Sequence, residues 1–169
     1  MSKLQKPVMT RKVEMYRELD GQLKSLLGEE RDFIANSANT SSLIYNALPD
    51  INWAGFYIHK HGELVIGPFQ GKPACVRIAI GTGVCGKAAF EQRTVIVENV
   101  LEFPGHIACD AASLSEIVVP ILHKDLLVGV LDIDSPKMAR FDTADKAGLE
   151  TLVKTFTTLT DCNGSPLGT

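Results

Sequence analysis

The spacing of apolar residues changes twice along this chain, and this change constrains the fold most. From Val13 to Leu27, apolar residues recur every three or four positions, which is typical of an amphipathic helix. A second helical pattern runs from about Asp32 to Leu48. A strand-like pattern then extends from Asn52 to Asp134, and helical spacing returns from about Thr143. Helices at both ends of a series of strands predict an α+β domain.

Short polar turns join several of the expected strands into hairpins. His61-Gly62 and His123-Lys124-Asp125 each separate two apolar runs. A short helix is expected at about 84–91, after Gly81-Thr82-Gly83, whose glycines favour a tight turn over a phosphate-binding loop. The expected strands cover residues 52–58, 63–69, 74–80, 94–98, 116–122 and 126–134. This arrangement predicts a central antiparallel sheet.

Length and composition indicate one globular domain. The 169 residues can form one substantial core but hardly two, and 45% hydrophobic with 22% charged residues is the composition of a folded protein. We expect a flexible N-terminal arm over residues 1–12 and a single domain over residues 13–160. A disordered tail is expected over residues 161–169, and it contains Cys162.

Charge and hydropathy argue against several classes of partner. The formal net charge of −3 disfavours nucleic-acid binding, because neutralising phosphates requires clustered Lys and Arg. No apolar run approaches the roughly 20 residues that span a bilayer, and residues 1–12 lack the apolar segment of a signal peptide. We therefore expect a cytoplasmic protein without membrane association, whose cysteines are reduced at rest.

Three isolated cysteines, Cys75, Cys85 and Cys109, lie inside the predicted domain. Metal sites usually contain closely spaced cysteine pairs, which this chain lacks, so a zinc site made by these thiols with His106 is the minor alternative. Separate thiols in a domain of this size suit redox chemistry, in which one cysteine attacks and another resolves the product as a disulfide. Cys109 is the most informative of the three, because it lies in a polar, glycine-bearing segment over residues 99–114.

Alternation along the expected strands places aromatic and acidic side chains above one sheet surface. Trp53 and Tyr57 share one face of their strand, Asp132 and Asp134 share a face of the last strand, and Glu116 opens the neighbouring strand. Aromatic rings beside carboxylates suit a cationic ligand with an apolar arm. The alternatives are core packing for the aromatics, a turn for Asp134 and solvation for Glu116. Asp132 is hardest to explain structurally, because a carboxylate inside an apolar strand is unfavourable unless paired.

Five short motifs together carry a resemblance to a known family. They are Asn52-Trp53-Ala54-Gly55-Phe56-Tyr57, Gly67-Pro68-Phe69-Gln70-Gly71-Lys72, Gly83-Val84-Cys85-Gly86, Gly105-His106-Ile107-Ala108-Cys109-Asp110-Ala111-Ala112-Ser113 and Gly129-Val130-Leu131-Asp132-Ile133-Asp134-Ser135. With them the chain resembles the free methionine-R-sulfoxide reductases, stand-alone GAF-domain enzymes, over about residues 34–156. The resemblance implies a GAF fold with about six antiparallel strands and helices packed on them, a homodimer, and recycling by thioredoxin.

The resemblance also implies roles for individual residues. Cys109 corresponds to the nucleophile, and Cys75 and Cys85 correspond to the other two family thiols, one of which resolves. Which of the two resolves stays open, as does the alternative that Cys85 is catalytic. The remaining matches are substrate-binding positions, namely the aromatic wall of Trp53 and Tyr57 and the acids Glu116, Asp132 and Asp134. The N-terminal extension and Cys162 lie outside the family pattern.

These roles imply reduction of free L-methionine (R)-S-oxide to L-methionine. The Cys109 thiolate attacks the sulfoxide sulfur, an acid protonates the oxygen, and the resulting sulfenic acid condenses with the resolving thiol to an intramolecular disulfide. The acids would bind the α-ammonium group that only free methionine carries. Backbone N–H groups from Ala111 to Ser113 are candidates for the α-carboxylate. We expect no metal or organic cofactor.

Two other functional classes stay open at this point. Some GAF domains are small-molecule sensors that bind cyclic nucleotides or chromophores, but no output domain is expected here and two aspartates in the pocket would repel a phosphate. A redox-sensing interaction protein would need the disulfide, but neither the carboxylates nor the aromatics. Turnover of free methionine sulfoxide distinguishes the enzyme from both alternatives.

Overall fold

The computed structural model describes residues 8–105 and 112–163, and the strands in these residues form one antiparallel sheet. The strand order across the sheet is β3-β2-β1-β6-β5-β4. The strands are β1 (Trp53–Lys60), β2 (Glu63–Gly71), β3 (Arg77–Ala79), β4 (Val95–Val97), β5 (Ser115–His123) and β6 (Leu126–Ser135). The expected α+β class, with a central antiparallel sheet of about six strands, is confirmed.

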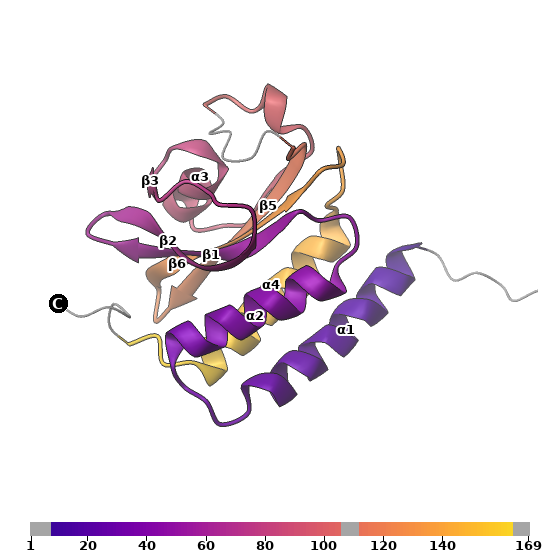
Figure 1. Cartoon of the computed structure of the whole chain (residues 1–169), viewed down its shortest axis with the longest axis vertical. Coiled ribbons are helices and arrows are strands. Elements are labelled where there is room, and N and C mark those ends of the chain that lie inside the picture. Colours follow the sequence, from indigo (N-terminus) through magenta and orange to yellow (C-terminus); the bar gives the residue numbers. More distant parts are fainter. Residues whose placement is uncertain (1–7, 106–111, 164–169) are drawn as a thin grey trace, which may run out of the picture.

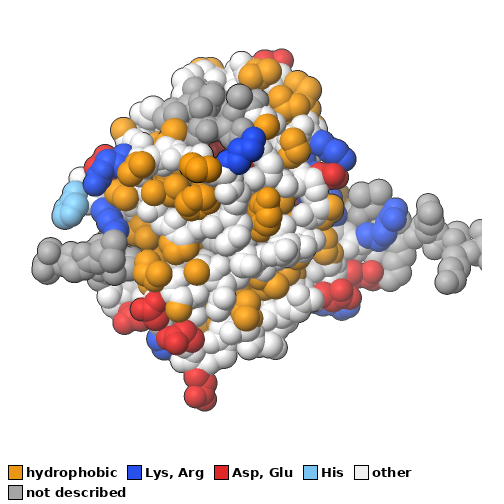
Figure 2. Space-filling view, in the orientation of Figure 1, with side chains coloured by type: hydrophobic (Ala, Val, Ile, Leu, Met, Phe, Trp, Pro, Cys, Tyr) orange, Lys and Arg blue, Asp and Glu red, His pale blue; other side chains and the backbone are white. Residues whose placement is uncertain are grey.

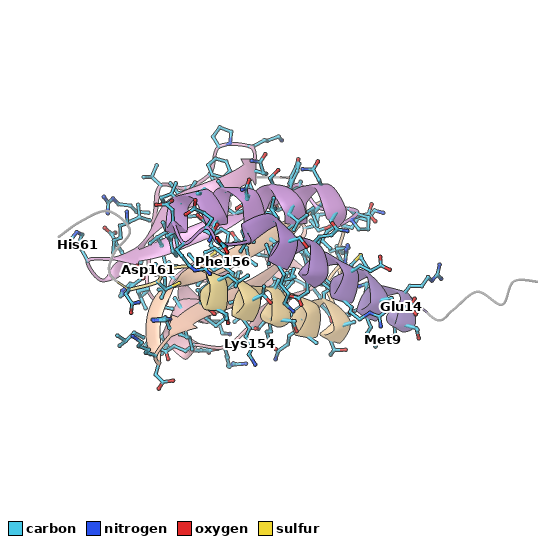
Figure 3. All side chains as sticks on the ribbon, turned by 90° about the horizontal axis from the view of Figure 1, so that it is seen from below. Met9, Glu14, His61, Lys154, Phe156 and Asp161 are labelled. Atoms are coloured by element: carbon cyan, nitrogen blue, oxygen red, sulfur yellow. The ribbon has the colours of Figure 1, made fainter. Side chains whose placement is uncertain are left out.

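Helices cover both faces of this sheet (Figure 1). On one face α2 (Phe33–Ala47) and α4 (Thr143–Leu159) contact the strands, and α1 (Val8–Leu27) packs on these two helices as an outer layer. The three helices extend over the sheet when viewed from their own side (Figure 3). On the opposite face α3 (Gly83–Glu91) contacts β5 and β6, and the 3-10 helix η1 (Val100–Glu102) follows β4.

The side chains of β1 alternate between two apolar cores, one on each side of the sheet. Ala54, Phe56 and Ile58 belong to the larger core beneath α2 and α4. Trp53 and Tyr57 belong to the smaller core on the side of α3. The sheet therefore separates a stabilising core from the face that carries the aromatic residues singled out in the sequence.

The first helix begins earlier than the apolar pattern indicates. α1 starts at Val8, so residues 8–12 of the expected flexible arm are helical, while residues 1–7 lie outside the described residues. Lys12 explains the difference, because its ammonium group binds the carboxylates of Asp142, at 2.8 Å, and Asp145 at the start of α4. An ion pair, not an apolar stripe, fixes this turn, and apolar periodicity does not report ion pairs.

The start of the expected disordered tail is also ordered. Residues 161–163 are described, whereas residues 164–169 lie outside the described part. The backbone N–H of Asp161 donates to the carbonyl of Arg31, 2.8 Å away. Cys162 is 7% exposed and packs in the larger core, so it is a core residue and not a residue of a loose tail.

The third strand is shorter than expected, and this matters for Cys75. β3 covers Arg77–Ala79 in place of the expected 74–80, so Cys75 lies in the connection between β2 and β3. Pro73 and the side-chain contact made by the Cys75 carbonyl, described below, keep this segment out of the strand ladder. The connection leaves Cys75 half-buried, between the half-buried Ala74 and the exposed Val76.

The length and hydropathy of the helices bear on whether the chain could span a membrane. None of the helices in the described residues is both long enough and apolar enough to cross a bilayer.

Figure 2 shows that charged side chains lie mainly around the periphery of the face in view, with apolar groups between them.

Candidate active site

The pairing of three central strands brings the predicted aromatic and acidic residues into adjacent rows. Trp53 of β1 is paired with Asp134 of β6, and Asp134 is paired with Glu116 of β5. In the next row, Gly55 is paired with Asp132. Cross-strand partners lie on the same face of a sheet, so these carboxylates lie on the same side as the Trp53 ring.

A pocket opens above this row of residues, between the sheet and α3. Its lining combines the aromatic rings, the acids, the β2–β3 connection and the first turn of α3. The lining residues are Trp53, Tyr57, Lys72, Pro73, Ala74, Ile78, Thr82, Gly83, Val84, Cys85, Ser113, Glu116, Asp132 and Asp134. Of the other predicted site residues, Cys75 directly follows the lining residue Ala74, and Cys109 and Ala111 lie outside the described residues.

The two aromatic side chains of the pocket are packed ring against ring. The rings of Trp53 and Tyr57 have centroids 5.8 Å apart and an interplanar angle of 25°. Phe69 of β2 stacks on the Trp53 ring as well. Trp53 is 3% exposed and Tyr57 is 2% exposed, so these residues are both core and pocket wall.

The same two aromatics also hold the segment that carries Cys75. Trp53 Nε1 donates to the carbonyl of Lys72 at 3.1 Å, and the Tyr57 hydroxyl donates to the carbonyl of Cys75 at 3.0 Å. The hydroxyl of Tyr57 is therefore used to position a backbone segment. This tether was not apparent from the sequence, because it depends on the path of the β2–β3 connection.

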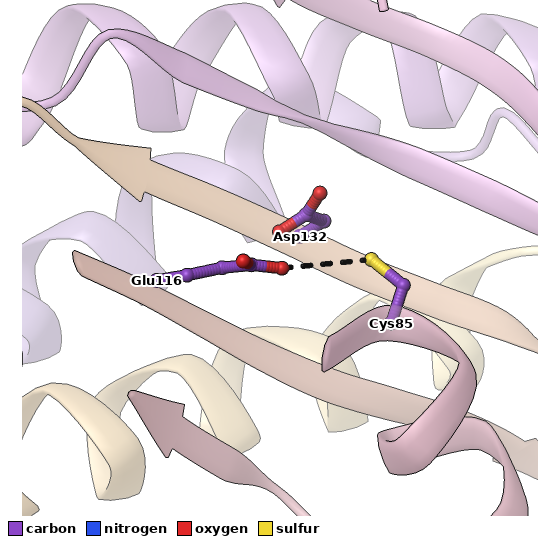
Figure 4. Close-up of side chains that lie close together, drawn as sticks. All are labelled: Cys85, Glu116 and Asp132. Carbon is purple, nitrogen blue, oxygen red and sulfur yellow. Dashed lines mark hydrogen bonds between the residues drawn. The ribbon is translucent and has the colours of Figure 1, made fainter. Parts of the chain in front are cut away.

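The acids form a buried cluster with Cys85. Glu116 is 7% exposed and Asp132 is 6% exposed, and the Cys85 thiol donates a long hydrogen bond to Glu116 Oε1, with 3.9 Å between sulfur and oxygen. Figure 4 shows the three side chains reaching toward one another from α3 and two neighbouring strands. The alternative that Glu116 is solvated at a strand end is therefore wrong for this structure.

Burial and mutual repulsion shift the protonation of this cluster. Burial, with the negative charges of Asp132 and Asp134, raises the pKa of Glu116 well above its ordinary value. Burial also raises the pKa of Asp132. Burial and the charges of Asp132 and Glu116 raise the pKa of the Cys85 thiol. A carboxyl group here can hold a proton near neutral pH, whereas the Cys85 thiol is poorly suited to form a thiolate.

The cysteines are in different states. Cys75 is disulfide-bonded, whereas Cys85 and Cys162 are free thiols. Cys162 packs in the core on the opposite side of the sheet from the pocket. Cys109, the proposed nucleophile, lies outside the described residues. Cys75 and Cys85, which were considered together in the sequence, thus differ in oxidation state and burial.

The residues that could bind a metal ion differ from those of the zinc site considered in the sequence. His106 and Cys109 lie outside the described residues, so that set of ligands is not described as a whole. In the described part of the chain, Cys85, Glu116 and Asp132 form a group whose potential ligand atoms lie within 4.8 Å of one another. This group joins one thiol to two carboxylates from different strands, a combination that sequence spacing could not reveal.

Sequence reasoning assigned no role to two parts of the pocket lining. The first turn of α3 lines the pocket at Thr82, Gly83 and Val84, and Lys72 lines it from the β2–β3 connection. Gly81 and Gly83 have positive φ values, 86° and 62°, so the tight turn expected there does precede the helix. A glycine turn directly before a helix was the available signal for this helix N-terminus.

Comparison with known proteins adds three findings of similarity. A family model described as GAF domain matches residues 36–159. The chain is 52% identical over 142 residues to the free methionine-R-sulfoxide reductase of Escherichia coli, covering 84% of this chain and 86% of that relative. Two solved structures are also similar.

Both of these structures contain a substrate. One is the Neisseria meningitidis free methionine-R-sulfoxide reductase in complex with its substrate, at a TM-score of 0.86 and 42% identity, covering 89% of this chain and 91% of that chain. The other is the Staphylococcus aureus fRMsr, also in complex with substrate, at a TM-score of 0.82 and 51% identity, covering 85% and 94%.

Proposed function

This chain belongs to the free methionine-R-sulfoxide reductases, a family of GAF-domain proteins, and on that premise we propose that it reduces free L-methionine (R)-S-oxide to L-methionine. The observation that carries the proposal is the pocket in which the buried acids of β5 and β6 lie on the same sheet face as the ring of Trp53. The relatives from Staphylococcus aureus and Neisseria meningitidis that were solved with substrate support it.

The carboxyl groups that line the pocket suit the α-ammonium group of the substrate. Asp132 and Asp134 lie on β6 and Glu116 lies opposite on β5, so three carboxyl groups face one pocket. A methionine inside a polypeptide has no ammonium group at this position and would leave the buried charge uncompensated. The cluster therefore selects the free amino acid, while the rings of Trp53 and Tyr57 contact its S-methyl end.

The opposite wall of the pocket suits the α-carboxylate. The first turn of α3, from Gly83, lines the pocket, and a helix N-terminus carries partial positive charge on its backbone N–H groups. Ser113 is 7% exposed, and its hydroxyl accepts a hydrogen bond from Asn52 Nδ2 at 3.1 Å. They would bind the α-carboxylate together with the backbone N–H groups expected from Ala111 to Ser113. Ala111 lies outside the described residues.

The chemistry transfers one oxygen atom from sulfur to sulfur. The Cys109 thiolate attacks the sulfoxide sulfur, and a carboxylic acid of the Glu116–Asp132 pair gives its proton to the sulfoxide oxygen. The oxygen then passes to the cysteine, so methionine leaves and Cys109 becomes a sulfenic acid. The raised carboxyl pKa values support this role, because a proton must be present near neutral pH.

We assign resolution to Cys75. Cys75 is disulfide-bonded in the structure and half-exposed, whereas Cys85 is a free and buried thiol whose pKa is raised. In the proposed step the Cys75 thiol attacks the Cys109 sulfenic acid, which forms a disulfide and releases water. Cys85 is left as a neutral thiol beside the acids.

Three further parts of the proposal follow from membership of the family. Thioredoxin is the expected donor, since thiol–disulfide exchange with an external dithiol returns both cysteines to the reduced state. We expect a homodimer in solution, which light scattering during size-exclusion chromatography tests. A cytoplasmic location suits an enzyme that starts each cycle with reduced thiols.

Turnover of racemic free methionine sulfoxide with dithiothreitol tests the proposed function. Chiral chromatography should show loss of the R epimer alone, with methionine formed in equal amount, and N-acetylated methionine sulfoxide should react far more slowly. Equal loss of both epimers would contradict the fixed pocket. Binding of substrate without any turnover would instead favour the sensor alternative.

A further inference from the structure

Three side chains at the base of the pocket are arranged like the ligands of a metal ion. Cys85 lies on α3, Glu116 on β5 and Asp132 on β6, and a potential ligand atom of each lies within 4.8 Å of the other two (Figure 4). The Cys85 sulfur and Glu116 Oε1 are 3.9 Å apart. All three residues are buried.

These separations approach those of a tetrahedral zinc ion. Zinc binds thiolate sulfur at about 2.3 Å and carboxylate oxygen at about 2.0–2.2 Å, so neighbouring ligands of a tetrahedron lie roughly 3.4–3.6 Å apart. Small side-chain rotations would bring the Cys85–Glu116 pair to this separation. The Cys85 thiol would release its proton on binding the metal, and a sulfur ligand favours zinc over magnesium or calcium, which prefer all-oxygen coordination.

An independent observation points to a cation at this place. Asp132 Oδ1 is buried and has no hydrogen-bond partner, and the whole residue is only 6% exposed. A buried carboxylate oxygen without a partner is unfavourable, and a bound cation removes that cost. Asp132 lines the pocket, so the oxygen belongs to a site that a small ion can enter.

We propose that Cys85, Glu116 and Asp132 bind one zinc ion, and that bound zinc excludes the substrate. Asp134 also lines this part of the pocket, and it or a water molecule completes the coordination. Zinc occupies the carboxyl oxygens that would otherwise hold the α-ammonium group and the catalytic proton. The exclusion of substrate rests on the proposed function, whereas the binding of zinc does not.

In the oxidised protein Cys75 is not available as a competing zinc ligand. With Cys75 in its disulfide, the free thiols in the described residues are Cys85 and Cys162. Zinc chloride is titrated by calorimetry, and cobalt(II) is titrated by absorption, since a thiolate-to-cobalt charge-transfer band reports a sulfur ligand. We expect one zinc ion per chain and a charge-transfer band in the wild-type protein.

Variants identify the ligands. Cys85→Ser should abolish the cobalt band and weaken zinc at least about tenfold, and the near-isosteric Glu116→Gln should weaken zinc by a similar factor. Cys162→Ser is the matched control, because it removes a free thiol on the far side of the sheet, and it should change neither result. A band that survives Cys85→Ser, or no band in the wild-type protein, overturns the site.

Competition tests the exclusion of substrate. L-Methionine should lower the apparent zinc affinity of the oxidised protein more than L-alanine does at the same concentration. Alanine is the matched competitor, because both amino acids chelate zinc through the same two groups and only methionine has the apolar arm that fits beside Trp53. Equal effects would refute competition, and turnover of methionine sulfoxide measured separately would leave the proposed function unaffected.

Discussion

The indole ring of Trp53 stacks on the phenyl ring of Phe69, with centroids 5.2 Å apart and planes inclined by 14°. Phe69 is not among the lining residues of the pocket, so it acts on the pocket through Trp53. Gly55, which is paired with Phe69, makes the contact possible: a Cβ at Gly55 would lie 2.3 Å from Phe69 Cβ and 2.8 Å from the Trp53 ring. Two residues outside the pocket therefore set the orientation of its indole.

Replacement of Phe69 should loosen this ring. Trp53 is the single tryptophan of the chain, so intrinsic fluorescence reports its environment directly. We expect Phe69→Leu to increase the quenching of Trp53 fluorescence by acrylamide. It should also lower kcat/KM by up to about tenfold, which corresponds to the loss of one aromatic–aromatic interaction. Phe69→Tyr keeps the ring and should behave as the wild-type protein. Lost activity with unchanged quenching would mean that Phe69 acts in another way.

Part of this site could be predicted from the sequence because strand alternation is a local property. Residues two positions apart share a face, so Trp53 with Tyr57 and Asp132 with Asp134 could be placed without knowledge of the fold. The role of Phe69 could not be predicted in this way. It depends on the register between β1 and β2, where a shift between Gly55 and Tyr57 interrupts the regular pairing.

Other features could not be predicted because they depend on contacts between distant segments. Cys85 meets Glu116 only because α3 packs on β5 and β6. The early start of α1 depends on an ion pair between Lys12 and Asp145, more than a hundred positions along the chain. Cys162 resembled a tail residue by composition, yet it is buried because the chain beyond α4 bonds to Arg31.

Single-turnover experiments should distinguish the roles of the cysteines by the amount of methionine that each variant releases. With reduced enzyme and no added reductant, Cys75→Ser should release about one methionine per chain, since the sulfenic acid can form without a resolving thiol. Cys109→Ser should release none, because a hydroxyl cannot accept the oxygen. Cys162→Ser serves as the unaffected control. A methionine burst from Cys109→Ser would transfer the nucleophilic role to Cys85.

The two aspartates of β6 should matter most for a substrate with a free amino group. Asp132→Asn or Asp134→Asn should raise KM for free methionine sulfoxide by about tenfold or more, the cost of one charged hydrogen bond. The slow reaction of the N-acetylated compound should change much less, because it has no ammonium group to lose. Equal losses on both compounds, measured by methionine release, would assign these residues to chemistry or folding.

Asp145 is expected to be the most sensitive charged residue for stability. It is fully buried and binds Lys12, Arg140 and the Tyr16 hydroxyl, the last at 2.9 Å. Asp145→Asn should lower the free energy of unfolding by about 3–5 kcal/mol, because it leaves two cations without their buried partner. Asp50→Asn breaks only an exposed pair and should cost less than about 1 kcal/mol. Urea denaturation compares the two, and similar losses would contradict the assignment.

Glu116 should make the protein less stable as the pH rises. Burial and the neighbouring aspartates raise its pKa in the folded state, so above the ordinary carboxyl pKa the unfolded chain releases this proton while the folded protein still holds it. The stability linked to Glu116 is therefore complete below the ordinary carboxyl pKa and is lost as the pH rises through the raised value. Glu116→Gln cannot titrate, so its melting temperature should rise relative to wild type as the pH increases above the ordinary carboxyl pKa. Calorimetry at a series of pH values measures this trend, and a constant difference between Glu116→Gln and wild type would mean that folded Glu116 does not hold its proton above the ordinary carboxyl pKa.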